Sequence, residues 1–210
     1  MDILIKICGM RDPDNIREVL TLNPDFIGFI FYPKSPRYVA SPETLNNIRF
    51  GQKTQKTGVF VNASLEEIMQ KVKLYDLQAV QLHGEEPVSL CCSLKNRGLM
   101  VLKAFQIHSE EDFNSTSVYN HQVDYFLFDA KTISYGGSGS KFDWSLLDAY
   151  QGDTPFFLSG GIASDDLDAI KKIRHPGFRG IDLNSRFETA PAIKNYMLLQ
   201  QFIKQLKQNE

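Results

Sequence analysis

The sequence of 210 residues lacks a disulfide pattern, metal-ligand spacing, strong charge of either sign and any long apolar run. Its three cysteines cannot all pair, and Cys91 and Cys92 are neighbours in a segment with helical patterning, so we expect no disulfide framework. There is no Cys-x-x-Cys pair, and the four histidines are scattered. These absences predict reduced thiols and no structural zinc.

The charge balance excludes whole classes of partner. The formal net charge is -2 and the pI is about 6.1, which argues against a general nucleic-acid or anionic-membrane surface, although a local basic pocket can still hold one phosphate. Residues 1–8 are too short and too soon interrupted by charge for a signal peptide, and no stretch reaches the roughly 20 apolar residues of a membrane span. We expect a cytoplasmic protein.

Short apolar runs alternate with amphipathic stretches along the chain, which is typical of parallel strands joined by helices. The sequence predicts eight strands, a number typical of barrels, so we expect a (β/α)8 or TIM barrel. Segment 109–122 has no helical periodicity, so the helix after the fifth strand is expected to be short or absent. The predicted strands are 2–8, 25–31, 56–61, 79–83, 99–105, 123–129, 155–159 and 179–183, and the predicted helices are 14–22, 42–49, 65–74, 87–96, 144–150, 165–173 and 191–208.

No proline-rich linker or composition break divides the chain, so we expect one catalytic barrel domain over residues 1–210. Typical barrels have about 250 residues, which makes this a trimmed version. The alternative is an open doubly wound sheet, which needs a topological switch point and usually fewer strands. The glycine-rich segment 135–140 follows the sixth strand and is interpreted as a mobile active-site loop.

Two strand ends carry reactive side chains. Cys8 closes the first strand and is followed by Gly9, which lets the chain turn and leaves the sulfur at the pocket rim, although a buried cysteine that only fills the core is about as common. Lys6 shares the face of Cys8 and is a candidate for perturbing the thiol. Asp129 ends an apolar strand whose walls disfavour its charged form; its alternative role is to cap loop amides or pair with Lys131. A thiol and a carboxyl facing one pocket could move protons without metal or cofactor, which predicts an isomerase.

The last two predicted strands end where barrels often hold phosphate. Gly160 and Gly161 follow the seventh strand, and Asp182, Asn184 and Ser185 end the eighth. Each group alone is typical of an ordinary turn, but together the two groups favour a phosphorylated small-molecule ligand.

Two further residues are weaker candidates for binding substrate. Arg37 lies in the loop after the second strand, where its guanidinium could bind a carboxylate or phosphate. His83 ends the fourth strand and either lines the pocket or makes a structural hydrogen bond.

Seven stretches at these strand ends resemble the phosphoribosylanthranilate isomerase family. They are KICGM (6–10), IGFIFYPKSPRYV (27–39), GVFVN (58–62), VQLHGEE (80–86), GGSGSKFDW (136–144), LSGGI (158–162) and GIDLNSRFE (180–188). Each stretch is modest evidence, but their order along nearly the whole chain is specific. The resemblance implies a (β/α)8 barrel that catalyses an Amadori rearrangement in tryptophan biosynthesis, with no cofactor and as a monomer or homodimer.

The resemblance also implies roles for individual residues. Cys8 corresponds to the general base and Asp129 to the general acid, Arg37 to the residue that holds the anthranilate carboxylate, and Gly160, Gly161, Asn184 and Ser185 to the phosphate loops. The final loop departs from the family pattern, because an amide replaces a hydroxyl at Asn184 and the bulky residues 186–187 follow.

Two rival functions remain at this point. One is another phosphosugar barrel, such as an indole-glycerol-phosphate synthase, which would be expected to use a different catalytic pair. The other is a catalytically silent barrel that binds a phosphorylated metabolite as a sensor or pairs with another enzyme, which fold alone does not exclude. The presence of both Cys8 and Asp129 favours the isomerase.

Overall fold

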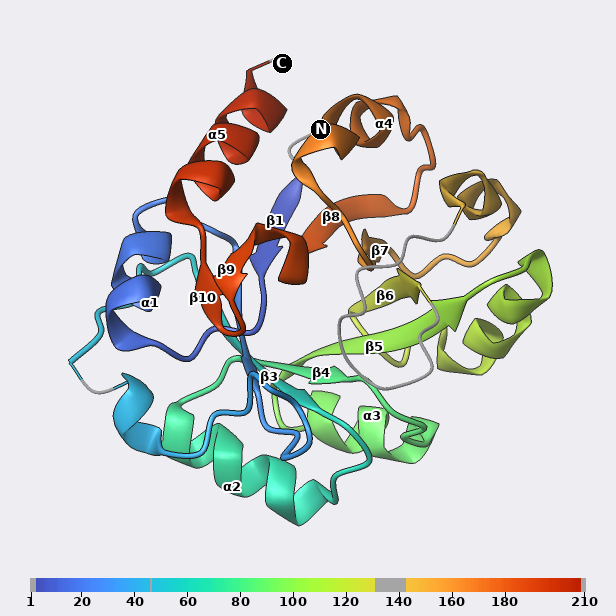
Figure 1. Ribbon diagram of the computed structural model, residues 1–210. Helices are drawn as coiled ribbons and strands as arrows, with labels where there is room; N and C mark the ends of the chain where they lie inside the picture. The colour runs from blue at the N-terminus through green and yellow to red at the C-terminus, as the bar shows by residue number, and fades with distance from the viewer. Residues whose placement is uncertain (1–2, 46, 131–142, 209–210) are drawn as a thin grey trace.

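Eight parallel strands form a closed barrel in the order β1 to β8, with β8 pairing with β1 (Figure 1). The structure is a computed structural model that describes residues 3–45, 47–130 and 143–208. The predicted (β/α)8 barrel and all eight strands are confirmed. The strands are β1 Leu4–Ile7, β2 Phe26–Ile30, β3 Gln55–Phe60, β4 Ala79–Leu82, β5 Met100–Ile107, β6 Tyr125–Ala130, β7 Phe156–Leu158 and β8 Phe178–Leu183.

The interior of the barrel is built in layers, because successive side chains of a strand point alternately inward and outward. An apolar cluster fills the end where the strands begin; its buried members are Phe26, Ala79, Leu102, Ala104, Leu127 and Phe157. Two residues further along β1, β4 and β8 the inward side chains are the buried polar groups of Lys6, Gln81 and Asp182. The next inward positions, at the carboxyl ends, are therefore left to line a cavity above this polar layer.

Helices surround the barrel and bury their apolar faces against its outer side (Figure 1). Side-chain caps mark several starts: Asp12 caps α1, and Ser64 and Glu67 form a capping box on α2. The helices are α1 Pro13–Leu20, η1 Pro42–Leu45, α2 Leu65–Tyr75, α3 Val88–Lys95, η2 Glu110–Tyr119, η3 Trp144–Ala149, η4 Ser164–Asp166, α4 Leu167–Lys172, η5 Ser185–Phe187 and α5 Tyr196–Lys207, where η denotes a 3-10 helix.

The connection between β5 and β6 is a 3-10 helix, η2, so the predicted absence of a regular helix there is confirmed. Other predicted helices are shorter than expected. The segment 144–150 forms the 3-10 helix η3, and the start of segment 42–49 forms η1. The segment 135–140, interpreted as a mobile loop, lies outside the described residues.

The predicted start of the last helix at Pro191 is wrong. The chain there forms an antiparallel hairpin of β9 (Glu188–Ala190) and β10 (Ile193–Lys194), which turns through Ala192 at a φ of 70°. The hairpin is tied to the barrel because its buried polar groups bond to residues far away in the sequence. Helix α5 begins only after it, capped by the side chain of Asn195.

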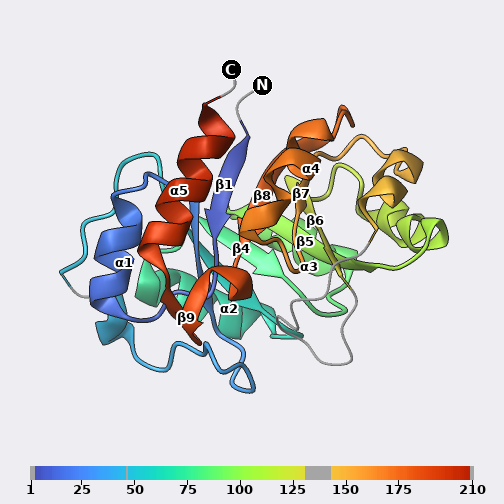
Figure 2. The ribbon, with the colours of Figure 1, turned by 45° about the horizontal axis from the view of Figure 1, so that its top comes forward.

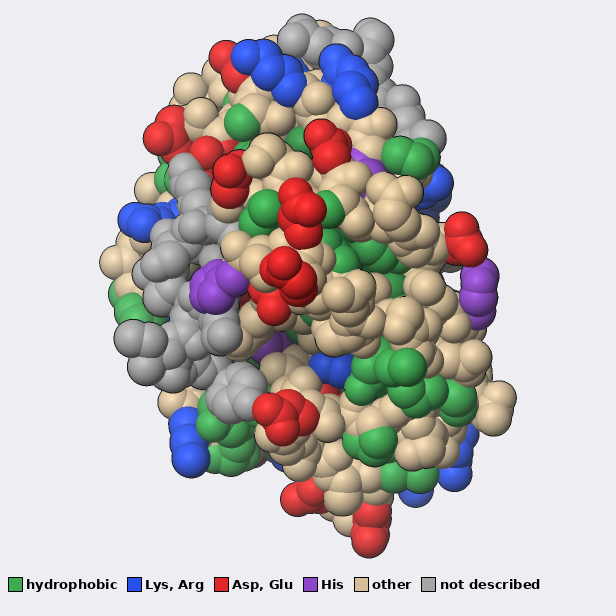
Figure 3. Space-filling view, turned by 90° about the vertical axis from the view of Figure 1, so that its right-hand side faces the viewer, with side chains coloured by type: hydrophobic (Ala, Val, Ile, Leu, Met, Phe, Trp, Pro, Cys, Tyr) green, Lys and Arg blue, Asp and Glu red, His purple; other side chains and the backbone are tan. Residues whose placement is uncertain are grey.

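The hairpin and the two chain ends lie at opposite ends of the barrel (Figure 2). The amino ends of the strands share one end with the termini, and the hairpin lies at the carboxyl ends with the strand-to-helix loops. The face that carries η2 and η3 shows mixed charge, with acidic side chains prominent near its centre (Figure 3). Within the described part of the chain, helices long and apolar enough to cross a membrane are absent.

Candidate active site

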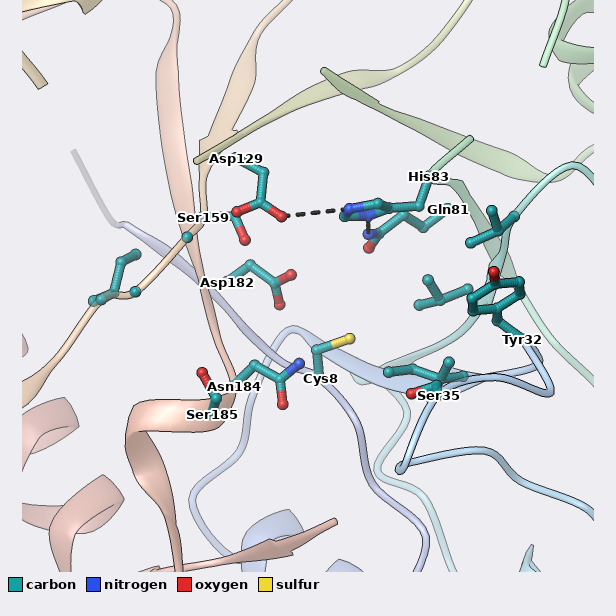
Figure 4. Close-up of a pocket in the computed structure, with 16 residues that line it drawn as sticks. Cys8, Tyr32, Ser35, Gln81, His83, Asp129, Ser159, Asp182, Asn184 and Ser185 are labelled. Carbon is teal, nitrogen blue, oxygen red and sulfur yellow. Dashed lines mark hydrogen bonds and ion pairs between the residues drawn. The ribbon is translucent and has the colours of Figure 1, made fainter. Parts of the chain in front are cut away.

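A cavity opens among the carboxyl ends of the strands (Figure 4). This is the end at which TIM barrels hold their active sites. Ile30, Val59 and Val61, at the ends of β2 and β3, contribute apolar side chains, and the predicted loop residues after β7 and β8 line the part of the cavity beside those strands. The lining residues are Cys8, Ile30, Tyr32, Ser35, Val59, Val61, Gln81, His83, Asp129, Ser159, Gly160, Gly161, Ile162, Asp182, Asn184 and Ser185.

Cys8 lies directly after β1, and its thiol faces this cavity. Its backbone N–H donates to the carbonyl of Leu183 at 2.9 Å, which continues the pairing of β1 with β8 and fixes the residue at the barrel rim. Gly9 has a φ of 77°, a conformation that favours glycine, and so turns the chain away after the thiol as expected. The space beside the sulfur comes from Gly28, where an added Cβ would lie 2.7 Å from Sγ.

We therefore expect Gly28→Ala to displace the thiol of Cys8. A displacement of this kind is expected to lower kcat by roughly 10- to 100-fold, because small errors in the position of a reacting group are costly. Steady-state kinetics would measure it. Gly51→Ala is the matched control, since the nearest atom to its added Cβ is 4.0 Å away. Equal activity of the two variants would show that the sulfur position has no influence on turnover.

The electrostatic surroundings of Cys8 combine burial with a nearby cation. Burial raises the pKa of the thiol, and the ammonium of Lys6 opposes this only in part. Lys6 is itself fully buried and donates to Asp182 at 2.9 Å, and this partner and the Cys8 sulfur together hold the pKa of Lys6 above its usual value despite burial. Lys6 is thus a perturber of Cys8, as its place on the same strand face indicated, but the net effect favours the thiol form.

Asp129 lies on β6, opposite Cys8 across the cavity (Figure 4). Its side chain is 18% exposed, and Oδ2 lies 3.4 Å from Nε2 of His83. His83 also pairs through Nδ1 with Nε2 of Gln81 at 2.8 Å. His83 therefore both lines the cavity and makes structural hydrogen bonds, the two alternatives that the sequence left open.

The predicted phosphate-binding residues meet at one side of the cavity. Gly160 and Gly161 have φ values of 82° and 67°, which bring the backbone after β7 close to the loop after β8. Asn184 and Ser185 line the same side, while the carboxylate of Asp182 lies deeper and pairs with Lys6. The arrangement offers backbone N–H groups and short polar side chains, which are typical partners of a phosphate.

Arg37 is not among the residues that line the cavity. Its guanidinium is buried behind the site and binds Glu188 through Nε at 2.9 Å and Nη2 at 2.6 Å. Glu188 also accepts from Lys194 at 2.7 Å, and Lys194 donates to the side-chain oxygen of Asn184 at 2.8 Å. This network, defined as Arg37, Glu188, Lys194 and Asn184, joins the loop after β2 to the hairpin and to the phosphate side of the cavity.

Sequence reasoning did not assign Glu188, Lys194 or Gln81. Glu188 closes the stretch GIDLNSRFE, and a carboxylate six residues before a lysine was a signal for a paired loop. Gln81 was visible as the polar residue inside an otherwise apolar strand, two residues before His83 and hence on the same face.

Removing the carboxylate of Glu188 is expected to destabilise the protein strongly. Glu188→Ala leaves two buried cations facing each other without an anion, which typically costs about 3–5 kcal/mol. Urea denaturation followed by circular dichroism would measure the change in the free energy of unfolding. Glu66→Ala, which removes an exposed carboxylate from α2, is the control. A loss below about 1 kcal/mol would show that the network contributes no more than a surface ion pair.

The same carboxylate gives the stability a dependence on pH. Burial alone would raise the pKa of Glu188, but the hydrogen bonds and charges of Arg37 and Lys194 outweigh it and lower the pKa below its usual value. A carboxyl whose pKa is lowered on folding stabilises the protein above its unfolded-state pKa, and the contribution is lost as the pH falls through the folded-state pKa. Unfolding curves at decreasing pH should show this loss in the wild type and a weaker one in Glu188→Gln.

Similarity to known proteins agrees with this geometry. The sequence profile of the family "N-(5'phosphoribosyl)anthranilate (PRA) isomerase" matches residues 5–205. An N-(5'-phosphoribosyl)anthranilate isomerase of Parabacteroides distasonis is 48% identical over 206 residues, which cover 97% of this chain and 93% of the relative.

Solved structures give the same match. The phosphoribosyl anthranilate isomerase of Thermotoga maritima is 35% identical, with a TM-score of 0.85 and coverage of 98% of this chain and 99% of that one. Another phosphoribosyl anthranilate isomerase structure, solved with reduced 1-(o-carboxyphenylamino)-1-deoxyribulose 5-phosphate, is 32% identical with a TM-score of 0.82, and the match covers 98% of this chain and 99% of that one.

The closed barrel and the cavity at its carboxyl end define a TIM-barrel enzyme, with the reactive groups at the strand ends. The matches extend over nearly the whole chain and include the strand ends that carry Cys8 and Asp129. The chain belongs to the N-(5'-phosphoribosyl)anthranilate isomerase family, and it is an isomerase.

Proposed function

We propose that the enzyme converts N-(5-phosphoribosyl)anthranilate to 1-(2-carboxyphenylamino)-1-deoxyribulose 5-phosphate, an Amadori rearrangement of tryptophan biosynthesis. The observation that carries this proposal is the placement of a thiol, Cys8, and a carboxyl, Asp129, across one cavity whose adjoining side offers phosphate-binding loops. The ligand bound to the related structure, a reduced 1-(o-carboxyphenylamino)-1-deoxyribulose 5-phosphate, has the skeleton of the proposed product.

In the first half of the reaction Asp129 acts as the general acid. The nitrogen lone pair of the substrate forms a C1=N bond as the bond between C1 and the ring oxygen breaks, and Asp129 delivers its proton to that oxygen. The product of this step is the open-chain protonated Schiff base, whose nitrogen keeps its hydrogen, and Asp129 is left as a carboxylate. The position of Asp129 on β6, among the residues that line the cavity, gives its carboxyl access to a bound substrate.

In the second half Cys8 acts as the general base. Its thiolate removes the proton from C2, the electron pair of that C–H bond forms the C1=C2 bond of the enolamine, and the pair of the C1=N bond returns to the nitrogen, which keeps its own proton. Ketonisation then gives the product: the C2 hydroxyl loses its proton and C1 gains one. Since burial raises the pKa of Cys8, its thiolate is scarce but is a strong base when formed.

Binding of the substrate uses the two sides of the cavity. We assign the phosphate to the side formed by Gly160, Gly161, Asn184 and Ser185, and the anthranilate ring to the apolar side. Arg37 stays our proposed partner of the anthranilate carboxylate. Its Nε and Nη2 donate to Glu188, and Nη1, which makes no hydrogen bond to another described residue, is left for the substrate.

The proposal extends to the setting of the enzyme. We propose that it works in the cytoplasm, without metal or cofactor and without nucleic-acid or membrane partners, as one catalytic domain that is monomeric or homodimeric. A phosphoribosylanthranilate isomerase of Thermotoga maritima is described as dimeric, which supports the homodimer as one of the two states. Size-exclusion chromatography with light scattering would separate the two.

The experiment that tests the proposal follows the fluorescence of phosphoribosylanthranilate, which is labile and must be generated in place. Addition of the purified wild-type protein should make the fluorescence decay rapidly, in proportion to protein concentration. A wild type that binds a reduced product analogue but does not accelerate the decay would instead support a silent barrel. A wild type that neither accelerates the decay nor binds the analogue would show that phosphoribosylanthranilate is not its substrate.

A further inference from the structure

Gln81 begins a line of three side chains that leads from the barrel interior to the carboxyl of Asp129 (Figure 4). Its side-chain nitrogen lies 2.8 Å from Nδ1 of His83, and Nε2 of His83 lies 3.4 Å from Oδ2 of Asp129. Strand β5 separates β4 from β6, but the small side chain of Ala104 on its inner face leaves room for the imidazole to reach across.

The direction of the Gln81 amide determines which ring nitrogen carries the proton. The amide nitrogen is only a donor, so Nδ1 of a neutral His83 must accept and the ring proton must be on Nε2. That proton is then on the ring nitrogen that lies 3.4 Å from Oδ2 of Asp129. The reversed amide would place its oxygen against Nδ1 and aim the lone pair of Nε2 at the carboxyl.

Only the first arrangement suits a residue that gives up a proton and regains it. Oδ2 can accept from His83 whether Oδ1 carries a proton or not, so the contact persists in both states of Asp129. It directs the acidic proton to Oδ1, on the substrate side, and stabilises the carboxylate that forms when the proton leaves. A lone pair at Nε2 would be tolerated only by the protonated acid.

A second observation concerns the other end of the same amide. The oxygen of Gln81 is buried and has no hydrogen-bond partner among the described residues, although the residue is only 1% exposed. Buried polar atoms are nearly always paired, so this exception needs an explanation, and among the described residues the bond to His83 is the one that orients the side chain.

We propose that Gln81 is a positioning residue for the general acid: its amide fixes the Nε2–H form of His83, and this form orients Asp129 toward the substrate. The inference rests on the proposed function, in which Asp129 is the acid. Gln81 acts through His83 and is not itself a catalytic residue. The chemistry that it supports is protonation of a ring oxygen on a phosphorylated sugar.

The direct test is the protonation pattern of His83 in the full-length protein, labelled with nitrogen-15 in its histidines. Under conditions in which the ring is neutral, long-range nitrogen–proton spectra should show an unprotonated Nδ1 and a protonated Nε2, with the resonances assigned from a His83→Asn variant. In Gln81→Glu the carboxylate can only accept a hydrogen bond from the ring, so Nδ1 should become the protonated nitrogen. A wild-type ring protonated at Nδ1 would overturn the proposal without reference to activity.

Kinetics give a second, independent test through Gln81→Leu, which keeps the size of the side chain and removes the amide. We expect kcat to fall by about tenfold or more while KM stays within about threefold, because the loss acts on proton transfer and not on binding. Thr57→Val is the matched control: Thr57 is fully buried on the neighbouring strand β3 and donates to the carbonyl of Gln55 at 3.5 Å. It should turn over like the wild type.

The outcomes separate this inference from the proposed function. A normal kcat in Gln81→Leu, or an equal loss in Thr57→Val, would show that the amide has only a structural role. A wild type without activity toward phosphoribosylanthranilate would defeat the proposed function, while the nitrogen resonances, which need no substrate, would still decide the form of His83.

Discussion

Asp129→Asn is expected to lower kcat by roughly three orders of magnitude, with little change in KM. The amide has the shape of the carboxyl but no acidic proton, and a positioned general acid typically contributes about 10²- to 10⁴-fold. Since His83 can still contact the amide oxygen, the architecture of the cavity should persist. Decay of phosphoribosylanthranilate fluorescence under single-turnover conditions would separate the chemical step from binding.

The control for this variant lies just before the same strand. Asp124 lies next to the amino end of β6, where Oδ2 accepts from the backbone N–H of Val101 at 2.7 Å, far from the cavity. Asp124→Asn should cost some stability but leave kcat unchanged. If Asp129→Asn retained more than about a tenth of the wild-type rate, another group would have to supply the proton to the ring oxygen.

Cys8→Ala is expected to reduce kcat by about 10³-fold or more, because it removes the base while leaving the cavity slightly larger. Cys8→Ser should be almost as inactive, since a hydroxyl is far less readily deprotonated than a thiol. Cys92→Ser is the matched control: this half-buried thiol donates to Gln122 at 3.0 Å, and a hydroxyl can replace it. Full activity of Cys8→Ser would contradict a thiolate base.

The rate should also depend on pH through Cys8. Burial raises the pKa of this thiol, and a base works only in its deprotonated form, so the rate attributable to the base should still be rising on the alkaline side of neutrality. Reaction of the thiol with iodoacetamide, measured against pH, would report the same titration without substrate. A thiol that is fully ionised at neutral pH would contradict the raised pKa.

The barrel strands could be predicted from sequence because most of them are short, largely apolar runs, as expected when both faces are covered. The start of the last helix was misplaced because proline is common at the first position of helices. This local pattern at Pro191 carries no information about contacts with residues distant in sequence. Its neighbour Glu188 is instead bound by Arg37 across 151 positions of sequence, and such a pairing decides the hairpin. The start of a helix that follows such a hairpin therefore cannot be predicted from local sequence patterns.

The candidate site divides in the same way. Cys8 and Asp129 could be predicted because each is a reactive side chain at the end of an apolar strand, where barrels place their chemistry. Gln81 could not, because its importance depends on a contact with His83 and on a buried oxygen without a partner, both of which appear only in three dimensions. Arg37 lies one layer behind the cavity, a depth that its loop position did not reveal.

The ring of strands closes where β8 pairs with β1, and this closure has a consequence for assembly. A chain severed between β4 and β5 would carry Cys8 on one fragment and Asp129 with the proposed phosphate-binding loops on the other. Neither fragment holds a complete set of reacting groups, so turnover would appear only as the two halves associate. Catalytic activity would then show that the two fragments have assembled into the closed barrel. Fragments that regain helices and strands without associating would stay inactive.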